Sequence, residues 1–256
     1  MAIFDSGNPT LSEKIFNRSL ADAHDGTMTV RGSINKFGFL MLMVIAGAIF
    51  TWRELMLGRP QNMQTFMMIG LFGGLVSGLI ISFKPATARY LSPAYAILEG
   101  FLLGGISAYI NLTVGKKYPG IVPQAVGLTF AVAIGMFLLY NFRIIKPTEK
   151  FKSVIASSVL GIFLFYIVIW ILSFFHVNIS FMSWNDASPL GIGISLFVIA
   201  IAALSLIMDF DRIETGEAMG APKYMEWYGA FGLLVTMIWL YLEILKLLSR
   251  FASNRN

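Results

Sequence analysis

The stretch PLGIGISLFVIAIAALSLIMDFDRIE, Pro189–Glu214, decides the fold class of this chain. Its first part, Pro189–Met208, contains no charged residue and is mostly apolar. A helix needs about 20 such residues to cross the roughly 30 Å hydrocarbon core of a membrane. The run leads directly into Asp209 and Asp211, although an acid at the centre of a span costs roughly 2.5–3.5 kcal/mol. The stretch therefore predicts a membrane-spanning helix whose end carries functional acids.

The composition of the whole chain also indicates an integral membrane protein. Of its 256 residues, 57% are hydrophobic and 13% are charged, whereas soluble domains carry about 25% charged residues. The chain has no Cys, which excludes disulfides and thiol nucleophiles, and its two His residues argue against a zinc site built on His. The net charge of +5 fits positive loops at a membrane surface rather than nucleic acid binding.

Seven apolar runs are long enough to span a membrane, so we expect an all-α polytopic protein with a seven-helix bundle. Turn residues such as Pro60, Pro85 and Pro147 separate these runs. The predicted spans are Lys36–Leu57, Thr65–Phe83, Ala88–Ile110, Val122–Phe142, Val154–Phe175, Pro189–Met208 and Glu226–Leu248.

The spans divide the chain into a cytosolic N-terminal tail (residues 1–33), a seven-helix transmembrane domain (34–250) and a C-terminal tail (251–256). The tail at 1–33 holds no apolar run that would act as a signal peptide. Its TLSE stretch, Thr10–Glu13, has the pattern of a capping box and predicts a short amphipathic helix on the membrane surface. A polar tail without a helix is the alternative.

The distribution of basic residues predicts the orientation in the membrane. Twelve Lys and Arg residues fall in the N-terminal tail and in the loops after the second, fourth and sixth spans. Seven fall on the other side of the membrane. Because cytosolic loops are the richer in Lys and Arg, we expect the N-terminus in the cytosol and the C-terminus outside.

Small residues recur every four positions in three spans. They are Gly70, Gly74 and Gly78 in the second, Gly100 and Gly104 in the third, and Gly191 and Ser195 in the sixth. Such stripes let helix backbones approach closely. They predict packing faces within the bundle, and a gating hinge is the alternative.

Five acids are candidates for ion conduction or pH sensing, since acids within a membrane mark ion or proton paths. Glu99 lies near the middle of the third span, Asp209 at the end of the sixth and Glu243 in the last. A neutral, hydrogen-bonded structural role is the alternative for Glu99. Asp211 is more typical of a solvated loop, and Glu226 of a residue that complements a helix N-terminus.

Three motifs resemble those of the Bax inhibitor (transmembrane Bax-inhibitor-motif) family, in particular its bacterial branch. They are DFDRI, which ends the sixth span, LYLEILKLL in the last span and EGFLLGG in the third. The stretches SGNPTLSEK and MTVRGSINKFG are similar to the leader of a longer bacterial subgroup. The resemblance covers nearly the whole chain and implies a bundle with the last helix central, in a bacterial inner membrane.

The resemblance also implies a pH-sensitive calcium leak that is controlled by a pair of carboxylates on the last two spans. Asp209 matches the first member of this pair, and Glu243 matches the second by its motif. The chain departs from the family pattern, in which both members of the pair are Asp. Here the pair is Asp with Glu, and the two residues are 34 positions apart. Depth in the membrane favours Glu226 as the partner of Asp209 instead.

The resulting hypothesis is a proton latch. Two close carboxylates lose their protons in coupled steps, so a shared proton would hold two helices together. Lys84 and Arg89 are the basic residues expected to pair with Asp209 and hold a closed state. Asp209 and Glu99 are the candidates for weak, transient calcium binding, since calcium prefers oxygen ligands.

The expected partners are the lipid bilayer, calcium ions and protons, with no nucleic acid and no resident cofactor. An enzyme is not expected, because the DFDRI acids have no HExxH partner and no nucleotide-binding glycine loop is present. The alternative function is a non-conducting regulator that binds a membrane-protein partner in proteolysis or stress response. Deleting residues 1–30 and measuring both ion flux and partner capture would separate the two.

Overall fold

The structure is a computed structural model that describes residues 26–115, 117–175, 181, 183–184 and 186–253. Seven of its helices are long and apolar enough to cross a membrane. The helices are α2 (Val30–Met56), α3 (Pro60–Phe83), α4 (Ala88–Thr113), α5 (Ile121–Asn141), α6 (Glu149–Phe174), α7 (Pro189–Ala218) and α8 (Met225–Ser253), with a short 3-10 turn, η2 (Pro85–Thr87), before α4. The predicted all-α polytopic membrane protein is confirmed.

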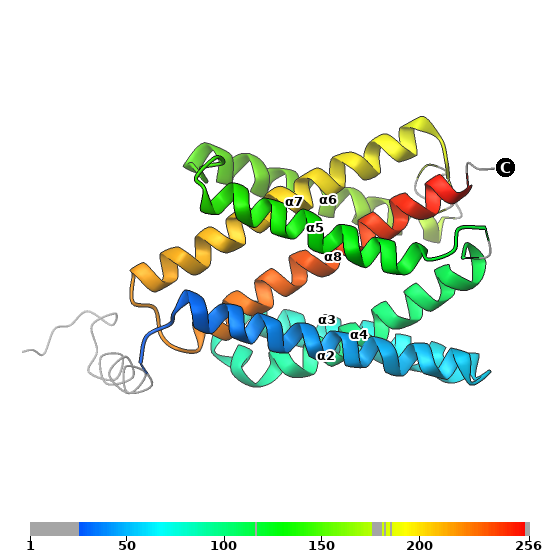
Figure 1. Ribbon diagram of the computed structural model, residues 1–256, viewed down its shortest axis with the longest axis horizontal. Helices are drawn as coiled ribbons and strands as arrows, with labels where there is room; N and C mark the ends of the chain where they lie inside the picture. The colour runs from blue at the N-terminus through cyan, green and yellow to red at the C-terminus, as the bar shows by residue number, and fades with distance from the viewer. Residues whose placement is uncertain (1–25, 116, 176–180, 182, 185, 254–256) are drawn as a thin grey trace, which may run out of the picture.

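The last helix, α8, runs between two groups of three helices (Figure 1). Helices α2, α3 and α4 pack together on one side, while α5, α6 and α7 lie on the other. Because α8 contacts members of both groups, it is the most buried of the seven spans. Several of its apolar side chains, such as Leu234, Leu240 and Leu245, are fully buried in the main core.

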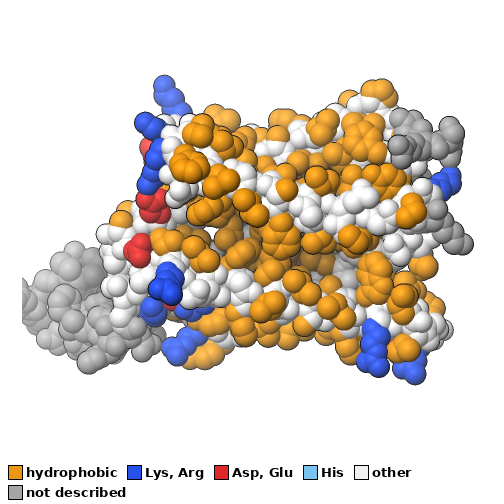
Figure 2. Space-filling view, viewed as in Figure 1, with side chains coloured by type: hydrophobic (Ala, Val, Ile, Leu, Met, Phe, Trp, Pro, Cys, Tyr) orange, Lys and Arg blue, Asp and Glu red, His pale blue; other side chains and the backbone are white. Residues whose placement is uncertain are grey.

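The outer surface matches a lipid environment. Hydrophobic side chains cover the long middle of the molecule, and charged side chains gather at its two ends (Figure 2). We call these ends the Glu226 end and the Arg250 end, after buried residues near either terminus of α8. Consecutive spans alternate in direction, so the C-termini of α3, α5 and α7 lie at the Glu226 end.

Several helices extend beyond the apolar runs because polar caps define their first residues. The Thr29 hydroxyl accepts a hydrogen bond from Gly32 N (2.9 Å), so α2 begins at Val30 rather than at Lys36. Thr148 likewise caps α6, which begins at Glu149 instead of Val154. A cap supplies an acceptor for an otherwise unpaired N–H of the first turn. The predicted amphipathic helix after Thr10 lies outside the described residues.

Gly70, Gly100 and Gly104 lie where helix backbones touch, as the sequence predicts, whereas Gly74 and Gly78 lie against the side chains of Glu99 and Tyr95. A Cβ atom added to Gly100 would lie 2.4 Å from the carbonyl oxygen of Val44 on α2. One added to Gly104 would lie 2.4 Å from the carbonyl oxygen of Ala48. Because backbone atoms cannot move aside as a flexible side chain can, α2 and α4 pack this closely only with glycine at these positions.

Replacing Gly100 with Ala should therefore lower the free energy of unfolding by about 1–3 kcal/mol, the usual cost of an overpacked core. The matched control is Gly135→Ala on α5, where an added Cβ atom meets nothing within 4 Å. That variant should be neutral or more stable by up to about 1 kcal/mol, because Ala favours a helix. Thermal unfolding in detergent measures both. Equal stability of the two variants would contradict the close contact of α2 with α4.

Candidate functional site

The acids that follow the apolar run of α7 reach different neighbouring helices. Asp209 accepts a hydrogen bond from the Thr236 hydroxyl of α8 (2.6 Å). Asp211 pairs with the Lys152 ammonium of α6 (2.9 Å). The interpretation of Asp211 as a solvated loop residue is wrong, because α7 continues as a helix to Ala218 and the Asp211 side chain is only 16% exposed.

The same pattern continues toward the end of α7. Glu214 accepts hydrogen bonds from the Tyr140 hydroxyl and the Arg143 guanidinium at the C-terminus of α5. Glu217 accepts one from the backbone N–H of Val30 on α2 (3.2 Å). The carboxylates thus connect α7 to α8, α6, α5 and α2 in turn. This arrangement explains why a charged segment follows the span without a break in the helix.

Glu99 and Asp209 line one pocket of about 400 Å³, which we call the carboxylate pocket. Helices α3, α4, α7 and α8 form its walls. The Glu99 carboxylate lies against α3, since a Cβ atom added to Gly74 would be 2.8 Å from its Oε1 atom. Glu99 is half-buried and Asp209 is buried. The fold therefore brings together two acids that are 110 positions apart in the chain.

The carboxylate pocket reaches toward the Glu226 end of the bundle, and exposed apolar residues such as Leu79 and Val235 also line it. Ser82 lines it near the C-terminus of α3 and is exposed. The guanidinium of Arg212 lies 3.6 Å from Asp209 Oδ1, while the Arg212 side chain is 70% exposed. A cation that enters from this end would meet Arg212 before it reaches the two acids.

Asp209 does not contact any of the partners predicted for it. Its ion pair is with Arg212, whereas Lys84 and Arg89 are exposed residues next to η2. Glu243 is seven residues beyond Thr236 on α8, which is about 10 Å along a helix. Glu243 instead accepts a hydrogen bond from the Tyr166 hydroxyl of α6 (2.6 Å).

Glu226 forms a separate cluster at the start of α8, which we call the clasp. The Glu226 side chain is fully buried and lies in the first turn of α8, as the sequence predicts. Its carboxylate accepts hydrogen bonds from both the backbone N–H and the hydroxyl of Thr29 (2.9 Å each). It also pairs with Lys36 and with Lys223 (2.7 Å). The clasp thus joins the starts of α2 and α8, and it does not contribute to the carboxylate pocket.

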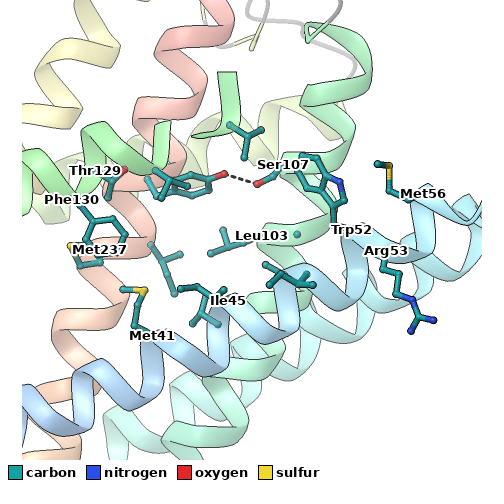
Figure 3. Close-up of a pocket in the computed structure, with 18 residues that line it drawn as sticks. Met41, Ile45, Trp52, Arg53, Met56, Leu103, Ser107, Thr129, Phe130 and Met237 are labelled. Carbon is teal, nitrogen blue, oxygen red and sulfur yellow. Dashed lines mark hydrogen bonds between the residues drawn. The ribbon is translucent and has the colours of Figure 1, made fainter. Parts of the chain in front are cut away.

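A second pocket, of about 690 Å³, is almost wholly apolar (Figure 3). It lies between α2, α4, α5 and α8, and its walls include Met41, Leu103, Phe130 and Met237. The Ser107 and Tyr241 hydroxyls share a hydrogen bond (2.6 Å) in its wall. We call it the apolar pocket.

The sequence interpretation missed Thr236, Tyr166 and Arg212. Thr236 is the only hydroxyl in the run AFGLLVTMIWL, and a lone polar residue within a span is a signal for a buried contact. Tyr166 sits in the run GIFLFYIVIW and carries the same signal. Arg212 has no comparable signal, because a basic residue after a span usually faces water.

The acids that the structure describes do not form a metal site. Within the described ranges, no group of three or more His, Asp or Glu side chains lies close enough to hold a metal ion. The carboxylate pocket supplies two carboxylates, whereas a stable calcium site uses six to eight oxygens. Its chemistry suits brief contact with a cation rather than storage.

A protein-family model described as Bax inhibitor 1 like matches residues 8–253 of the chain. The match spans every helix of the bundle. No curated protein and no solved structure matches the chain.

Proposed function

The chain belongs to the Bax inhibitor 1 like family, and from this premise we propose that it is a pH-sensitive calcium leak in a membrane. The carboxylate pocket carries this proposal, since it brings Glu99 and Asp209 into one opening among four spans. Acids are retained within spans chiefly where they serve ions or protons.

Calcium and protons would compete for the same carboxylates. A buried carboxylate needs either a proton or a cation to offset its charge. At low pH, protons neutralise Glu99 and Asp209 and leave no negative charge for calcium. At higher pH the carboxylates are free to bind a passing cation, so calcium flux rises with pH.

Arg212 would act as the gating cation in place of Lys84 and Arg89. Its guanidinium lies near Asp209 while most of its side chain is exposed. The Arg212 side chain can therefore move away from Asp209 without exposing other buried groups to water. Asp209 is buried, so its charge needs a cation nearby. A calcium ion at the pocket mouth would take over this role from the exposed Arg212 side chain.

We also propose an orientation of the protein in the membrane. Basic loops favour a cytosolic Glu226 end, and the carboxylate pocket would then open to the cytosol. The inner membrane of a bacterium is the proposed location, and no resident cofactor is proposed.

Calcium uptake by liposomes that contain the purified protein tests this function. A calcium dye inside the liposomes should report uptake above that of protein-free liposomes, and the rate should rise as the external pH is raised. Uptake equal to that of empty liposomes at every pH would contradict a calcium leak.

The apolar pocket supports a second candidate function, the binding of a membrane-protein partner by a non-conducting regulator. Its apolar wall between α2 and α5 suits an apolar transmembrane segment. A photo-crosslinking residue at Val126, which lines this pocket, would capture such a partner in native membranes. Capture from Val126 without any calcium uptake would favour the regulator.

A further inference from the structure

Buried polar side chains occupy one face of the second half of α8, away from the carboxylate pocket. Glu243 and Lys246 are each 6% exposed, and Ser249 and Arg250 are fully buried. Their spacing of three, three and one residues keeps them on one side of the helix. Buried charges within a membrane are costly unless they serve one another or a ligand.

The Tyr166 ring lies against both charges of this face. Its hydroxyl donates to Glu243 Oε1 at 2.6 Å, and the Lys246 ammonium lies 5.4 Å from the centre of its ring. Glu243 Oε2 is buried and has no hydrogen-bond partner among the residues that the structure describes. A carboxylate oxygen left unpaired in this way costs about 1–3 kcal/mol or more, so Glu243 has an open position for a cation.

Arg250 cannot fill that position, because other groups already hold its guanidinium. It donates hydrogen bonds to the carbonyl oxygens of Gly191, Phe181 (2.6 Å) and Ser183 (3.2 Å), and to the Ser195 hydroxyl (2.9 Å). These contacts fix the end of α8 to the start of α7 and the segment before it.

Lys246 remains as the cation nearest to Glu243 along the helix. Its ammonium makes no hydrogen bond within the described part of the chain, and it lies over the Tyr166 ring at the end of a flexible four-carbon stem. An ammonium in this place neutralises the region around Glu243 and occupies space that a mobile cation would need.

We propose that Glu243 and Tyr166 form a second cation-binding site and that Lys246, whose ammonium lies over the Tyr166 ring, is a tethered cation that competes for it. Lys246 then blocks the passage of cations from the carboxylate pocket toward the Arg250 end. The blocking role rests on the proposed calcium leak, whereas the cation site can be tested by binding alone.

Terbium binding to the full-length protein in detergent tests the site. Tb³⁺ seeks oxygen ligands and becomes luminescent near an excited indole, and Trp239 lies one helical turn before Glu243. Lys246→Met should bind Tb³⁺ about tenfold or more tightly than the wild type, because no ammonium competes for the carboxylate. Lys246→Arg keeps the charge and should behave as the wild type. The double variant Glu243→Gln with Lys246→Met should lose the added luminescence.

Lys246→Gln provides a second neutral variant if Lys246→Met does not fold, and a melting curve identifies that case. Luminescence that is equal in the wild type and both neutral variants would overturn the proposal. So would a gain that persists in the double variant.

Calcium uptake by liposomes, measured in parallel, separates this inference from the proposed function. Lys246→Met should take up calcium several-fold faster than the wild type. If the wild type takes up calcium and Lys246→Met takes it up at the same rate, only the blocking role of Lys246 is overturned. Tb³⁺ binding as expected, without calcium uptake by any variant, would overturn only the calcium leak.

Discussion

Replacing Asp209 with Asn should abolish most of the pH dependence of calcium uptake and should lower uptake at neutral pH about tenfold or more, where tenfold corresponds to about 1.4 kcal/mol. Asn has nearly the same size as Asp and can still accept the hydrogen bond from Thr236. It carries no charge and exchanges no proton, so the carboxylate pocket keeps its shape while it loses one of its two acids. Uptake by liposomes at a series of pH values measures the effect.

Asp211→Asn is the matched control, because it makes the same chemical change two residues away. Asp211 pairs with Lys152 and does not line the carboxylate pocket. Its variant should keep the wild-type pH profile, with a stability change within about 1 kcal/mol. If both variants lost the pH dependence equally, a general effect of negative charge near α7 would replace the specific role of Asp209.

Replacing Glu226 with Gln should lower the free energy of unfolding by about 2–3 kcal/mol. Removing one partner of a buried ion pair costs about 3–5 kcal/mol. We expect a smaller loss for Glu226→Gln, because the Lys36 and Lys223 side chains are 21% and 42% exposed. Gln retains an acceptor for Thr29 but leaves both ammonium groups without a carboxylate. Chemical denaturation in detergent measures the loss.

Glu217→Gln provides the comparison for the clasp. Like Glu226, Glu217 joins two helices, since it accepts a hydrogen bond from Val30 N and so connects the end of α7 to the start of α2. Unlike Glu226, Glu217 is exposed. Its variant should lose no more than about 1 kcal/mol, because water can replace an exposed partner. A Glu226 variant as stable as the Glu217 variant would show that the clasp does not stabilise the bundle.

The seven spans could be predicted from the sequence because each is an apolar run of the length that lipid requires. The ends of the helices could not, because they depend on caps outside those runs. The start of α2 is an example. Thr29 caps it, and Thr29 is in turn held by Glu226, which is 197 positions later in the chain. No local pattern encodes a contact over such a distance.

The candidate site could be predicted only in part from the sequence. Asp209 and Glu99 stand out because acids are rare within spans. Their shared pocket depends on how α3, α4, α7 and α8 pack, which periodicity alone does not specify. Lys246 and Arg250 are among the seven basic residues that the charge count assigns to the non-cytosolic side of the membrane, yet both are buried. A basic residue near a span end has the same local pattern whether it faces water or a neighbouring helix.

The proposed calcium leak requires a proton that moves on and off Asp209 within the carboxylate pocket. Infrared difference spectroscopy of the protein in lipid, recorded across a pH step, observes this proton through the carbonyl band of the protonated acid. This band should appear in the wild type and in Asp211→Asn and should be missing from Asp209→Asn. Identical spectra for the wild type and Asp209→Asn would contradict it.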